Sequence, residues 1–358
     1  MAPIRLAIIG LSSSAVTSWA SSAHLPYLLS ARGRAKYNIV ALCNSSVESA
    51  KKAIRTYGLD VEKTRAYGDP AALAADPDID LVLCCTRVDT HHHLIKPSVE
   101  AGKAAFVEWP LTHDVVRSRE LADLAAKKGI HTMVGLQGRL APVVLKLKEL
   151  LHGGSLGKML SSERLTSMKV FDYVQSVIGQ AADTHPQLQL QRPKMKLRDP
   201  ATNNIVKTVT SDVPDLITVT GSLSGSAVAQ EGASLLVRFR RGQQFKGEPA
   251  LTWHINCEKG EVRLTAPSGT SLHANSYSDP VTIEVHDFHT DEVRNVSWEW
   301  PEWEEELNLP IVGRSVAKLY EAFHAETVEG GPRTYPNFLD AIERHEQLAK
   351  LLESWRTA

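Results

Sequence analysis

A serine-rich turn that begins with a glycine follows the first apolar run of the chain, and its residues could bind phosphate. The run Ile4–Ile9 leads directly into Gly10-Leu11-Ser12-Ser13-Ser14-Ala15. A glycine at this point lets the chain turn sharply, and a helix that follows presents free N–H groups and a positive dipole end to an anion. Serine hydroxyls can donate further hydrogen bonds. The residues predicted to contact a pyrophosphate are Gly10, Ser12, Ser13 and Ala15.

This turn keeps only part of the G-x-G-x-x-G pattern of dinucleotide sites, because Ser12 and Ala15 occupy the later glycine positions. The second apolar run, Tyr37–Cys43, is followed by Asn44 and Ser45, which are predicted to contact the ribose. Sites for NAD commonly have a carboxylate here for the ribose hydroxyls, and sites for NADP an arginine nearby. Neither residue follows directly, so the cofactor is predicted to be NAD or NADP.

The elements that must position this turn alternate between apolar runs and helical patterns over residues 1–135. Nearly continuous apolar strands separated by helices are typical of a parallel sheet covered on both faces. Right-handed crossovers then give an α/β, doubly wound Rossmann domain. The predicted strands are Ile4–Ile9, Tyr37–Cys43, Asp80–Thr86, Ala104–Glu108 and Thr132–Leu136. The predicted helices are Ser18–Ser30, Val47–Tyr57, His92–Ala101 and Val115–Lys128.

Residues 136–358 are predicted to form an α+β domain with a mostly antiparallel, open sheet. Cys257–Glu261 has the composition of a tight hairpin turn, and Thr184–Asn204, which is polar and contains proline, predicts a loop. An open sheet face can meet a second copy, so a homo-oligomer is predicted. The predicted strands are Leu160–Val170, Thr208–Ser222, Ala233–Phe239, Ala250–Cys257 and Glu261–Thr265, and the predicted helices are Val312–Glu326 and Leu339–Trp355.

The composition is that of an ordinary globular protein, with 43% hydrophobic and 23% charged residues and a formal net charge of −1. Such a chain has no general attraction for nucleic acid or for an anionic membrane. No apolar run reaches the roughly 20 residues that span a bilayer, and the N-terminal run is short, unlike a signal peptide. The predicted location is the cytoplasm, with the nucleus also open. The four cysteines form no C-x-x-C pair, which favours buried free thiols.

Two further groups of residues are conspicuous. His91, His92 and His93 are consecutive, but neighbouring helix residues point about 100° apart and cannot converge on one metal ion. No metal site is therefore predicted. Trp298 and Trp300 share one face if their segment is extended, where they either pack within the fold or join a subunit or partner interface. The glutamates beside them would repel nucleic acid, so direct DNA binding is not predicted.

Five motifs lie within the first 160 residues: Thr86–His91, Glu100–Lys103, Glu108–Leu111, Gly135–Arg139 and Gly153–Lys158. Together they resemble the glucose–fructose oxidoreductase/inositol dehydrogenase/MocA family. V-E-W-P and G-L-Q-G-R are most similar to its fungal branch, which contains the galactose-regulon repressor of yeasts. The resemblance implies a dinucleotide-binding Rossmann domain. It also implies one of two functions: an oxidoreductase acting on a sugar, polyol or related small metabolite, or a catalytically silent transcriptional regulator that binds a protein partner.

Position in this family also implies roles for single residues. In the family, the E-K-P motif places a lysine beside the nicotinamide, and a lysine with a lowered pKa can take the hydroxyl proton as hydride leaves. This chain has Trp109 at that position, and an indole is no base at neutral pH. No catalytic residue is therefore predicted. The residues expected at the nicotinamide end are Thr86, His91, Glu108 and Trp109, with a plain helix-start role as an equal alternative for His91. Gln137 and Arg139 are expected to bind substrate, and a surface salt bridge is an equal alternative for Arg139.

The chain departs from the family a second time, near residue 170. Members have an Asp-x-x-x-His-like pair at the start of a helix, and its histidine helps to hold the substrate. Here Leu165–Val170 runs directly into Phe171–Gly179, which resembles only the tail of that helix. The second domain is therefore predicted to be truncated near residue 170, without the matching histidine.

Overall fold

The computed structural model describes residues 2–15, 18–165, 171–199, 202–242 and 244–356. The chain divides into two compact units. The first contains Met1–Gln137 and Glu302–Ala349, and the second contains Gly138–Pro301 and Lys350–Ala358. The Rossmann unit thus includes a C-terminal segment that the sequence pattern assigned to the second domain.

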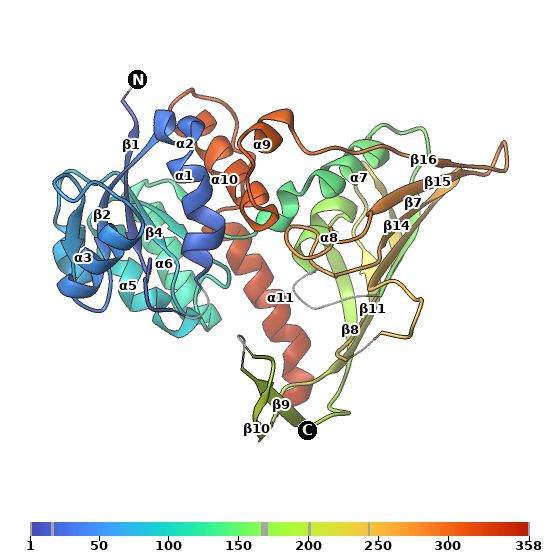
Figure 1. Cartoon of the computed structure of the whole chain (residues 1–358). Helices are drawn as coiled ribbons and strands as arrows, with labels where there is room; N and C mark the ends of the chain where they lie inside the picture. Colours follow the sequence, from blue (N-terminus) through green and yellow to red (C-terminus); the bar gives the residue numbers. More distant parts are fainter. Residues whose placement is uncertain (1, 16–17, 166–170, 200–201, 243, 357–358) are drawn as a thin grey trace. The chain divides into compact units, whose positions relative to one another are not determined.

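The first unit contains a six-stranded sheet in which each strand is parallel to its neighbours (Figure 1). The order across the sheet, β3-β2-β1-β4-β5-β6, is that of the doubly wound Rossmann fold. The predicted α/β class is therefore confirmed. The strands are β1 (Ile4–Ile9), β2 (Tyr37–Cys43), β3 (Arg65–Tyr67), β4 (Leu81–Cys84), β5 (Ala104–Val107) and β6 (Thr132–Val134).

Local signals set where the helices of this unit begin and end. The hydroxyl of Ser46 accepts a hydrogen bond from the backbone of Ser49 and caps α3, and the carboxylate of Asp114 caps α6. Gly129 ends α6 in the left-handed conformation. The helices are η1 (Ala20–His24), α1 (Leu25–Leu29), α2 (Ala31–Lys36), α3 (Val47–Thr56), α4 (Pro70–Ala74), α5 (Val88–Glu100), α6 (Val115–Lys128), α9 (Glu302–Glu306), α10 (Ile311–Thr327) and α11 (Phe338–Arg356).

Different elements pack against the two faces of the sheet. Successive residues of a strand contact opposite sides, because their side chains alternate. On β5, Ala105 belongs to a buried cluster with residues of α5 and α6. Phe106 points the other way, where its ring packs edge-on against His24 of η1 and Tyr320 of α10. Tyr320 is fully buried, and the backbone after α10 also bonds to the edge strand β6. These contacts join the C-terminal segment to the Rossmann unit.

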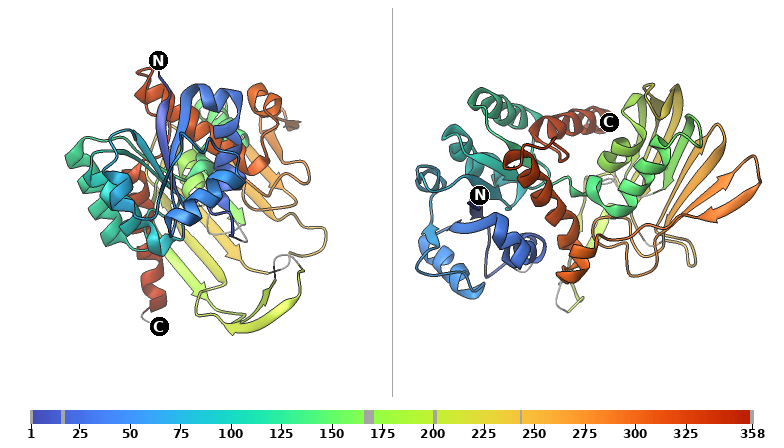
Figure 2. Two further views of the ribbon diagram at one scale, coloured as in Figure 1. Left: turned by 60° about the vertical axis from the view of Figure 1, so that its left-hand side comes forward. Right: turned by 90° about the horizontal axis from the view of Figure 1, so that it is seen from above.

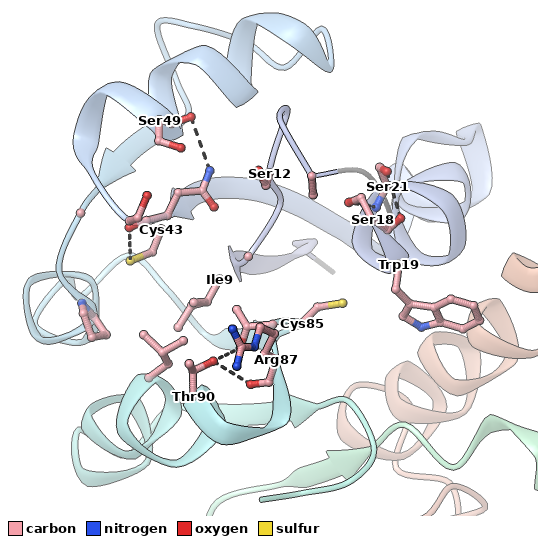
Figure 3. Close-up of a pocket in the computed structure, with 18 of the residues that line it drawn as sticks. Ile9, Ser12, Ser18, Trp19, Ser21, Cys43, Ser49, Cys85, Arg87 and Thr90 are labelled. Atoms are coloured by element: carbon pink, nitrogen blue, oxygen red, sulfur yellow. Dashed lines mark hydrogen bonds between the residues drawn. The ribbon is translucent and has the colours of Figure 1, made fainter. Parts of the chain in front are cut away.

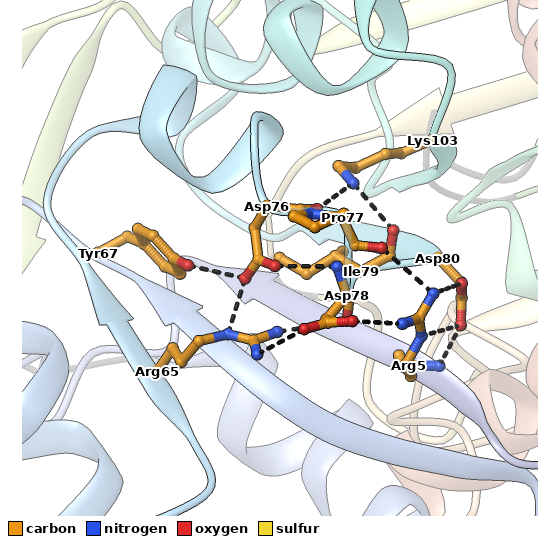
Figure 4. Close-up of polar contacts among 9 residues, drawn as sticks. All are labelled: Arg5, Arg65, Tyr67, Asp76, Pro77, Asp78, Ile79, Asp80 and Lys103. Carbon is orange, nitrogen blue, oxygen red and sulfur yellow. Dashed lines mark hydrogen bonds and ion pairs between the residues drawn. The ribbon is translucent and has the colours of Figure 1, made fainter.

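Polar side chains tie together the amino ends of the parallel strands (Figure 4). Arg5, in β1, donates through Nε and Nη2 to the carboxylate of Asp80, which precedes β4, at 3.0 and 2.7 Å. These hydrogen bonds hold the pKa of the Asp80 carboxyl below its usual range. Arg65, which begins β3, pairs with Asp76 at 2.7 Å, and Lys103 donates to backbone carbonyls of the same loop. Because such sheets bind ligands at their carboxyl end, this cluster is structural.

The second unit contains an eight-stranded, mostly antiparallel sheet with the order β16-β15-β14-β13-β7-β12-β11-β8 (Figure 2). Only the pairing of β7 with β12 is parallel among its described strands. Helices α7 (Pro142–His152) and α8 (Phe171–Ile178) lie along one face of this sheet. The predicted α+β class with an open antiparallel sheet is confirmed. The strands are β7 (Met159–Leu165), β8 (Ala181–Gln189), β11 (Leu216–Leu223), β12 (Ala229–Arg240), β13 (Leu251–Cys257), β14 (Gly260–Ala266), β15 (Thr282–Asp287) and β16 (Glu292–Asn295).

The prediction of a loop over Thr184–Asn204 is wrong. Most of β8 and all of β9 (Lys194–Arg198) fall within it, and β9 pairs with β10 (Ile205–Thr210) in a separate two-stranded sheet. β8 is an edge strand of the large sheet, where Pro186 pairs with Val219 of β11. A proline is tolerated there because the outer side of an edge strand needs no N–H donor.

The prediction of one strand over Thr208–Ser222 is also wrong, since the segment is divided between β10 and β11. Asp215 marks the break. Its carboxylate accepts hydrogen bonds from the backbone N–H groups of Gln191 and Arg192, both at 2.7 Å. This side chain therefore bonds to backbone of another segment, a contact that β-propensity alone does not predict.

The predicted strand Leu160–Val170 is present as β7, which ends at Leu165. Residues 166–170, where the deletion is predicted, lie outside the described residues. Phe171–Ile178 is helical, as the resemblance to a helix tail implies.

The tryptophans near residue 300 pack within the fold. Trp298 donates through Nε1 to the carbonyl of Val281 at 2.9 Å, and its ring contacts those of Trp300 and Tyr277. This agrees with the first of the two predictions made for them. In the ranges that the structure describes, no helix has the length and apolar character needed to cross a membrane.

Candidate functional site

A cavity of about 1310 Å³ opens in the first unit at the carboxyl ends of β1, β2 and β4 (Figure 3). Doubly wound sheets bind ligands at this end. Drug-sized ligands occupy pockets of roughly 300–1,000 Å³, so the cavity has room for a dinucleotide. The predicted cofactor contacts that line it are Gly10, Ser12, Ala15, Asn44, Ser45 and Thr86. Four others, Ser13, His91, Glu108 and Trp109, are not among its described lining residues.

Gly10 forms the turn at the centre of the cavity wall. Its φ is +100°, a conformation that residues with a side chain rarely adopt. A Cβ at this position would overlap the carbonyl oxygen of Cys85 and lie 2.6 Å from Cγ2 of Thr86. Gly10 N donates to the carbonyl of Cys43, and Cys85 N donates to that of Ile9, both at 3.0 Å. The ends of three strands are thus tied together where only glycine fits.

The cavity wall at the carboxyl end of β2 is polar, and side-chain hydrogen bonds hold it in place. Asn44 donates through Nδ2 to the carbonyl of Leu11 at 2.9 Å, which joins the end of β2 to the turn after β1. The Tyr57 hydroxyl donates to the carbonyl of Ser12 at 2.8 Å. Asn44 therefore fixes the turn through its amide as well as facing the cavity, a role that its position alone did not reveal.

No described residue that lines the cavity is an aspartate or a glutamate. The basic residues among the described lining of the cavity are Arg87 and His93. Arg87 is highly exposed and pairs with Asp89 at 3.1 Å. A 2′-phosphate would therefore meet no carboxylate here, and the ribose hydroxyls of NAD would meet amide and hydroxyl groups.

Several lining residues carry no sequence signal for this site. Cys85 is mostly buried, and burial raises the pKa of its thiol well above the usual value, so it is a neutral wall residue. Ser18 and Trp19 directly precede η1 and Ser21 lies within it, and none of them belongs to a recognised motif. The remaining unpredicted lining residues include Ser22, Ser49, Tyr57, Gly68, Pro70, Arg87, Thr90, His93 and Leu94.

His91 has a structural position beside the cavity. It is almost completely buried, and its two ring nitrogens lie 2.9 Å from the carbonyl oxygen of Pro110 and 3.1 Å from that of Thr86. The ring therefore links the turns after β4 and β5, and the Trp109–Pro110 peptide bond in the second of these turns is cis.

Glu108 follows β5 and is held in a buried hydrogen-bonded chain. Its Oε1 lies 3.0 Å from Nε2 of His24, and Nδ1 of the same ring lies 2.9 Å from the hydroxyl of Tyr320. If the tyrosine donates to Nδ1, Nε2 carries the proton and donates to the carboxylate. Gly135 leaves room for this group, since a Cβ there would lie 2.5 Å from Oε2 of Glu108. The sequence placed Glu108 at a strand end but gave no sign of His24.

Trp109 points to the opposite face of the sheet from Glu108. It packs against the buried cluster that includes Phe338 and Ala341. Its ring centre lies 4.8 Å from that of His345 in α11. Burial lowers the pKa of the His345 imidazole to about 4, which keeps this ring neutral at ordinary pH. The indole thus serves packing of the first unit.

The two predicted substrate residues belong to different units. Gln137 is buried in the first, and its Oε1 has no hydrogen-bond partner within the described part of the chain. Arg139 is in the second unit, where Nη2 lies 2.7 Å from the carboxylate of Asp172. Both side chains of this pair are largely buried, so the ion pair is internal and not at the surface.

Over the described residues, no group of three or more His, Cys, Asp or Glu side chains is placed to hold a metal ion. All four cysteines are free thiols, and three of them are buried.

The glycine turn, the polar ribose wall and the cavity size together fit a dinucleotide, and the sheet order is that of a Rossmann fold. The fold and the site define a nucleotide-binding protein of the dehydrogenase type. A sequence model of the oxidoreductase family with an NAD-binding Rossmann fold (GFO_IDH_MocA) matches residues 4–136. Dehydrogenase aclE of Aspergillus oryzae is 30% identical over 299 residues, which cover 76% of this chain and 79% of that protein. The chain belongs to this oxidoreductase family.

Two further relatives are regulators. The galactose/lactose metabolism regulatory protein GAL80 of Saccharomyces cerevisiae is 29% identical over 168 residues, 45% of this chain and 37% of that protein. The crystal structure of a super-repressor mutant of Gal80p from the same yeast matches with a TM-score of 0.84 at 19% identity, over 99% of this chain and 96% of that chain. The structural match shows the fold. Relatives of this chain therefore include both a dehydrogenase and a metabolic regulatory protein.

Proposed function

We propose that this protein binds NAD or NADP in the strand-end cavity and acts as an oxidoreductase on a sugar, a polyol or a related small metabolite. The observation that carries the proposal is the cavity of about 1310 Å³ around the turn at Gly10. Backbone and hydroxyl groups of Ser12 and its neighbours would hold the pyrophosphate. Asn44 and Ser45 would face the ribose. The nicotinamide, when bound, supplies the hydride acceptor or donor of the reaction.

Oxidation of an alcohol also releases a proton, which needs an acceptor. Glu108 is the carboxylate at the end of β5, and its carboxylate group is oriented by His24 at 3.0 Å. Glu108 is buried and does not line the described cavity, so we assign this carboxylate and His24 a structural role beside the site and no part in proton transfer. Trp109 takes no part in proton transfer, because an indole has no basic nitrogen and its ring packs against His345.

The polar wall beside β2 supports binding of both cofactors. A carboxylate that selects NAD would repel the 2′-phosphate of NADP, and the described cavity lining has none. We expect the dissociation constants of NADH and NADPH to differ by less than about tenfold, which corresponds to about 1.4 kcal/mol. Titration of the full chain with each, followed by nicotinamide fluorescence, measures this ratio.

A second function is supported by Trp109, which stands where the family resemblance has lysine. In this alternative the protein binds the dinucleotide without turnover and regulates transcription through a protein partner. The relative GAL80 is a regulatory protein by name, and the partner of this chain is not identified by any residue.

One experiment separates the two functions. The full chain is first titrated with NADH and NADPH, and then assayed for reduction of NAD and NADP by a panel of polyols and sugars. Oxidation of any of them, with formation of NADH or NADPH, supports the oxidoreductase. Tight cofactor binding with no turnover, even in Trp109→Lys, supports the regulator. Absence of cofactor binding contradicts both.

Three predictions remain proposals about the protein in its cell. We propose that it is a homo-oligomer that associates through the open face of the eight-stranded sheet, which light scattering of the purified chain tests. We also propose a fungal origin and a cytoplasmic location, or a nuclear one for the regulator. Imaging of a tagged chain in the source organism tests the location.

A further inference from the structure

Arg164 is a fully buried cation in the second unit. It lies on β7 and is 0% exposed. Nη2 donates to the hydroxyl of Tyr173, and the guanidinium lies 4.5 Å from the ring centre of Tyr173 and 4.8 Å from that of Trp253. Nε and Nη1 have no hydrogen-bond partner among the residues that the structure describes.

The aromatic surroundings offset only part of the cost of burying this charge. An unpaired buried ion is strongly unfavourable, because no water remains to solvate it. Cation–π contacts with two rings compensate in part. Burial lowers the pKa of the Arg164 guanidinium to about 10, and the interactions with Tyr173 only partly oppose this change. The described part of the fold therefore disfavours the charge that it encloses.

A neighbouring arginine shows how this unit satisfies a guanidinium when a carboxylate is present. Arg139 donates through Nε and Nη2 to Asp172, at distances of 2.7 to 3.1 Å. Asp172 directly precedes Tyr173, which contacts Arg164, yet the carboxylate of Asp172 pairs with Arg139. Residues 166–170, which join β7 to α8, contain no aspartate or glutamate. The sequence of this connection thus contains no carboxylate.

We propose that the unpartnered Nε and Nη1 of Arg164 form a binding site for a small carboxylate, with the Tyr173 hydroxyl, which accepts from Nη2, holding the guanidinium in place. The groups around it are fixed in place: Trp253 donates through Nε1 to Ser162 at 2.9 Å, and the Tyr173 hydroxyl donates to the carbonyl of Thr270 at 3.2 Å. A carboxylate oxygen would accept hydrogen bonds from Nε or Nη1 and supply a negative charge to pair with the guanidinium of Arg164. All of these residues belong to the second unit, so the proposal does not depend on the oxidoreductase activity.

The test measures thermal unfolding of the full chain in sodium glycolate, with sodium chloride at equal ionic strength and neutral glycolamide as controls. A ligand that binds the folded state raises the midpoint as its concentration increases. We expect this rise with glycolate only, in the unchanged protein and in Arg263→Met. Arg263 is the matched control because it lies on β14 of the same sheet, is half exposed and pairs with Glu284 at 2.8 Å.

Arg164→Met is expected to abolish the glycolate response and to fold at least as stably in chloride, because methionine fills the space without a charge. If that variant does not fold, Tyr173→Phe provides the second test, and we expect its glycolate affinity to fall about 5-fold, because the guanidinium of Arg164 loses the hydroxyl that holds it in place. No rise in the unchanged protein overturns the proposal. So does an equal rise in Arg164→Met, an equal rise with sodium phosphate, or an unchanged affinity in Tyr173→Phe.

Discussion

Replacement of Gly10 by alanine tests whether the turn after β1 is both a structural requirement and the centre of the cofactor site. The residue has φ of +100°, and the added Cβ would lie 2.6 Å from Cγ2 of Thr86 and overlap the carbonyl oxygen of Cys85. A non-glycine residue in such a conformation costs on the order of 1–3 kcal/mol. Overpacking against a buried backbone adds about 1–3 kcal/mol. Gly10→Ala should therefore lower the free energy of unfolding by about 2–6 kcal/mol.

Gly102 offers a matched control, because it separates backbone strain from steric overlap. Its φ is +79°, and a Cβ there would have no atom within 4 Å. It lies between α5 and β5, at the amino end of the sheet and away from the cavity lining. Gly102→Ala should cost only the strain, about 1–3 kcal/mol, and should leave cofactor affinity unchanged.

The assay is urea unfolding of both variants, combined with titration by NADH. We expect Gly10→Ala to lose more stability than Gly102→Ala and to bind NADH at least tenfold more weakly, since the turn must shift away from Cys85. Equal stability losses in the two variants would show that the strand ends move apart easily. Unchanged NADH affinity in Gly10→Ala would refute the placement of the dinucleotide.

Other predictions concern groups outside the cavity. Burial raises the pKa of the Glu304 carboxyl from its ordinary value of 4.5 to about 7. Protonation of Glu304 therefore stabilises the folded state fully below pH 4.5, and this stabilisation is lost as the pH rises through about 7. The loss amounts to up to about 3 kcal/mol. Glu304→Gln should remove this decrease in urea unfolding measured from pH 5 to 8, and identical slopes would contradict it. The pKa of the His345 imidazole is lowered to about 4, so its effect on stability has the opposite sign. Its contribution to the free energy of unfolding is present above pH 6.5 and is lost on acidification, so the stability of His345→Gln should be less sensitive to acid than that of the unchanged protein. A greater sensitivity would be evidence against a neutral ring. Asp80→Ala should lower the free energy of unfolding by about 1 kcal/mol, because it removes an exposed ion pair with Arg5 and a hydrogen bond. NADH affinity should not change. Weaker NADH binding would show that the amino end of the sheet is coupled to the cavity.

Much of the first unit follows from local sequence. The strand over Ile4–Ile9 and the helix over Val115–Lys128 have the predicted bounds, because continuous apolar runs and capping residues are local signals. The turn at Gly10 also follows from its position after the first strand. In the second unit, the edge strand through Pro186 could not be predicted in this way, since its pairing with β11 joins segments far apart in the chain.

The sequence by itself determined the fold class, the family and the end of the sheet at which a nucleotide binds. Only the tertiary structure decided which side chains meet. Glu108 and Trp109 are adjacent in sequence just after β5, yet Glu108 contacts His24 and Trp109 packs against His345. Arg164 is buried beside two aromatic rings while Asp172 serves another arginine. Such pairings depend on the packing of distant segments, and neither residue type nor local spacing carries that information.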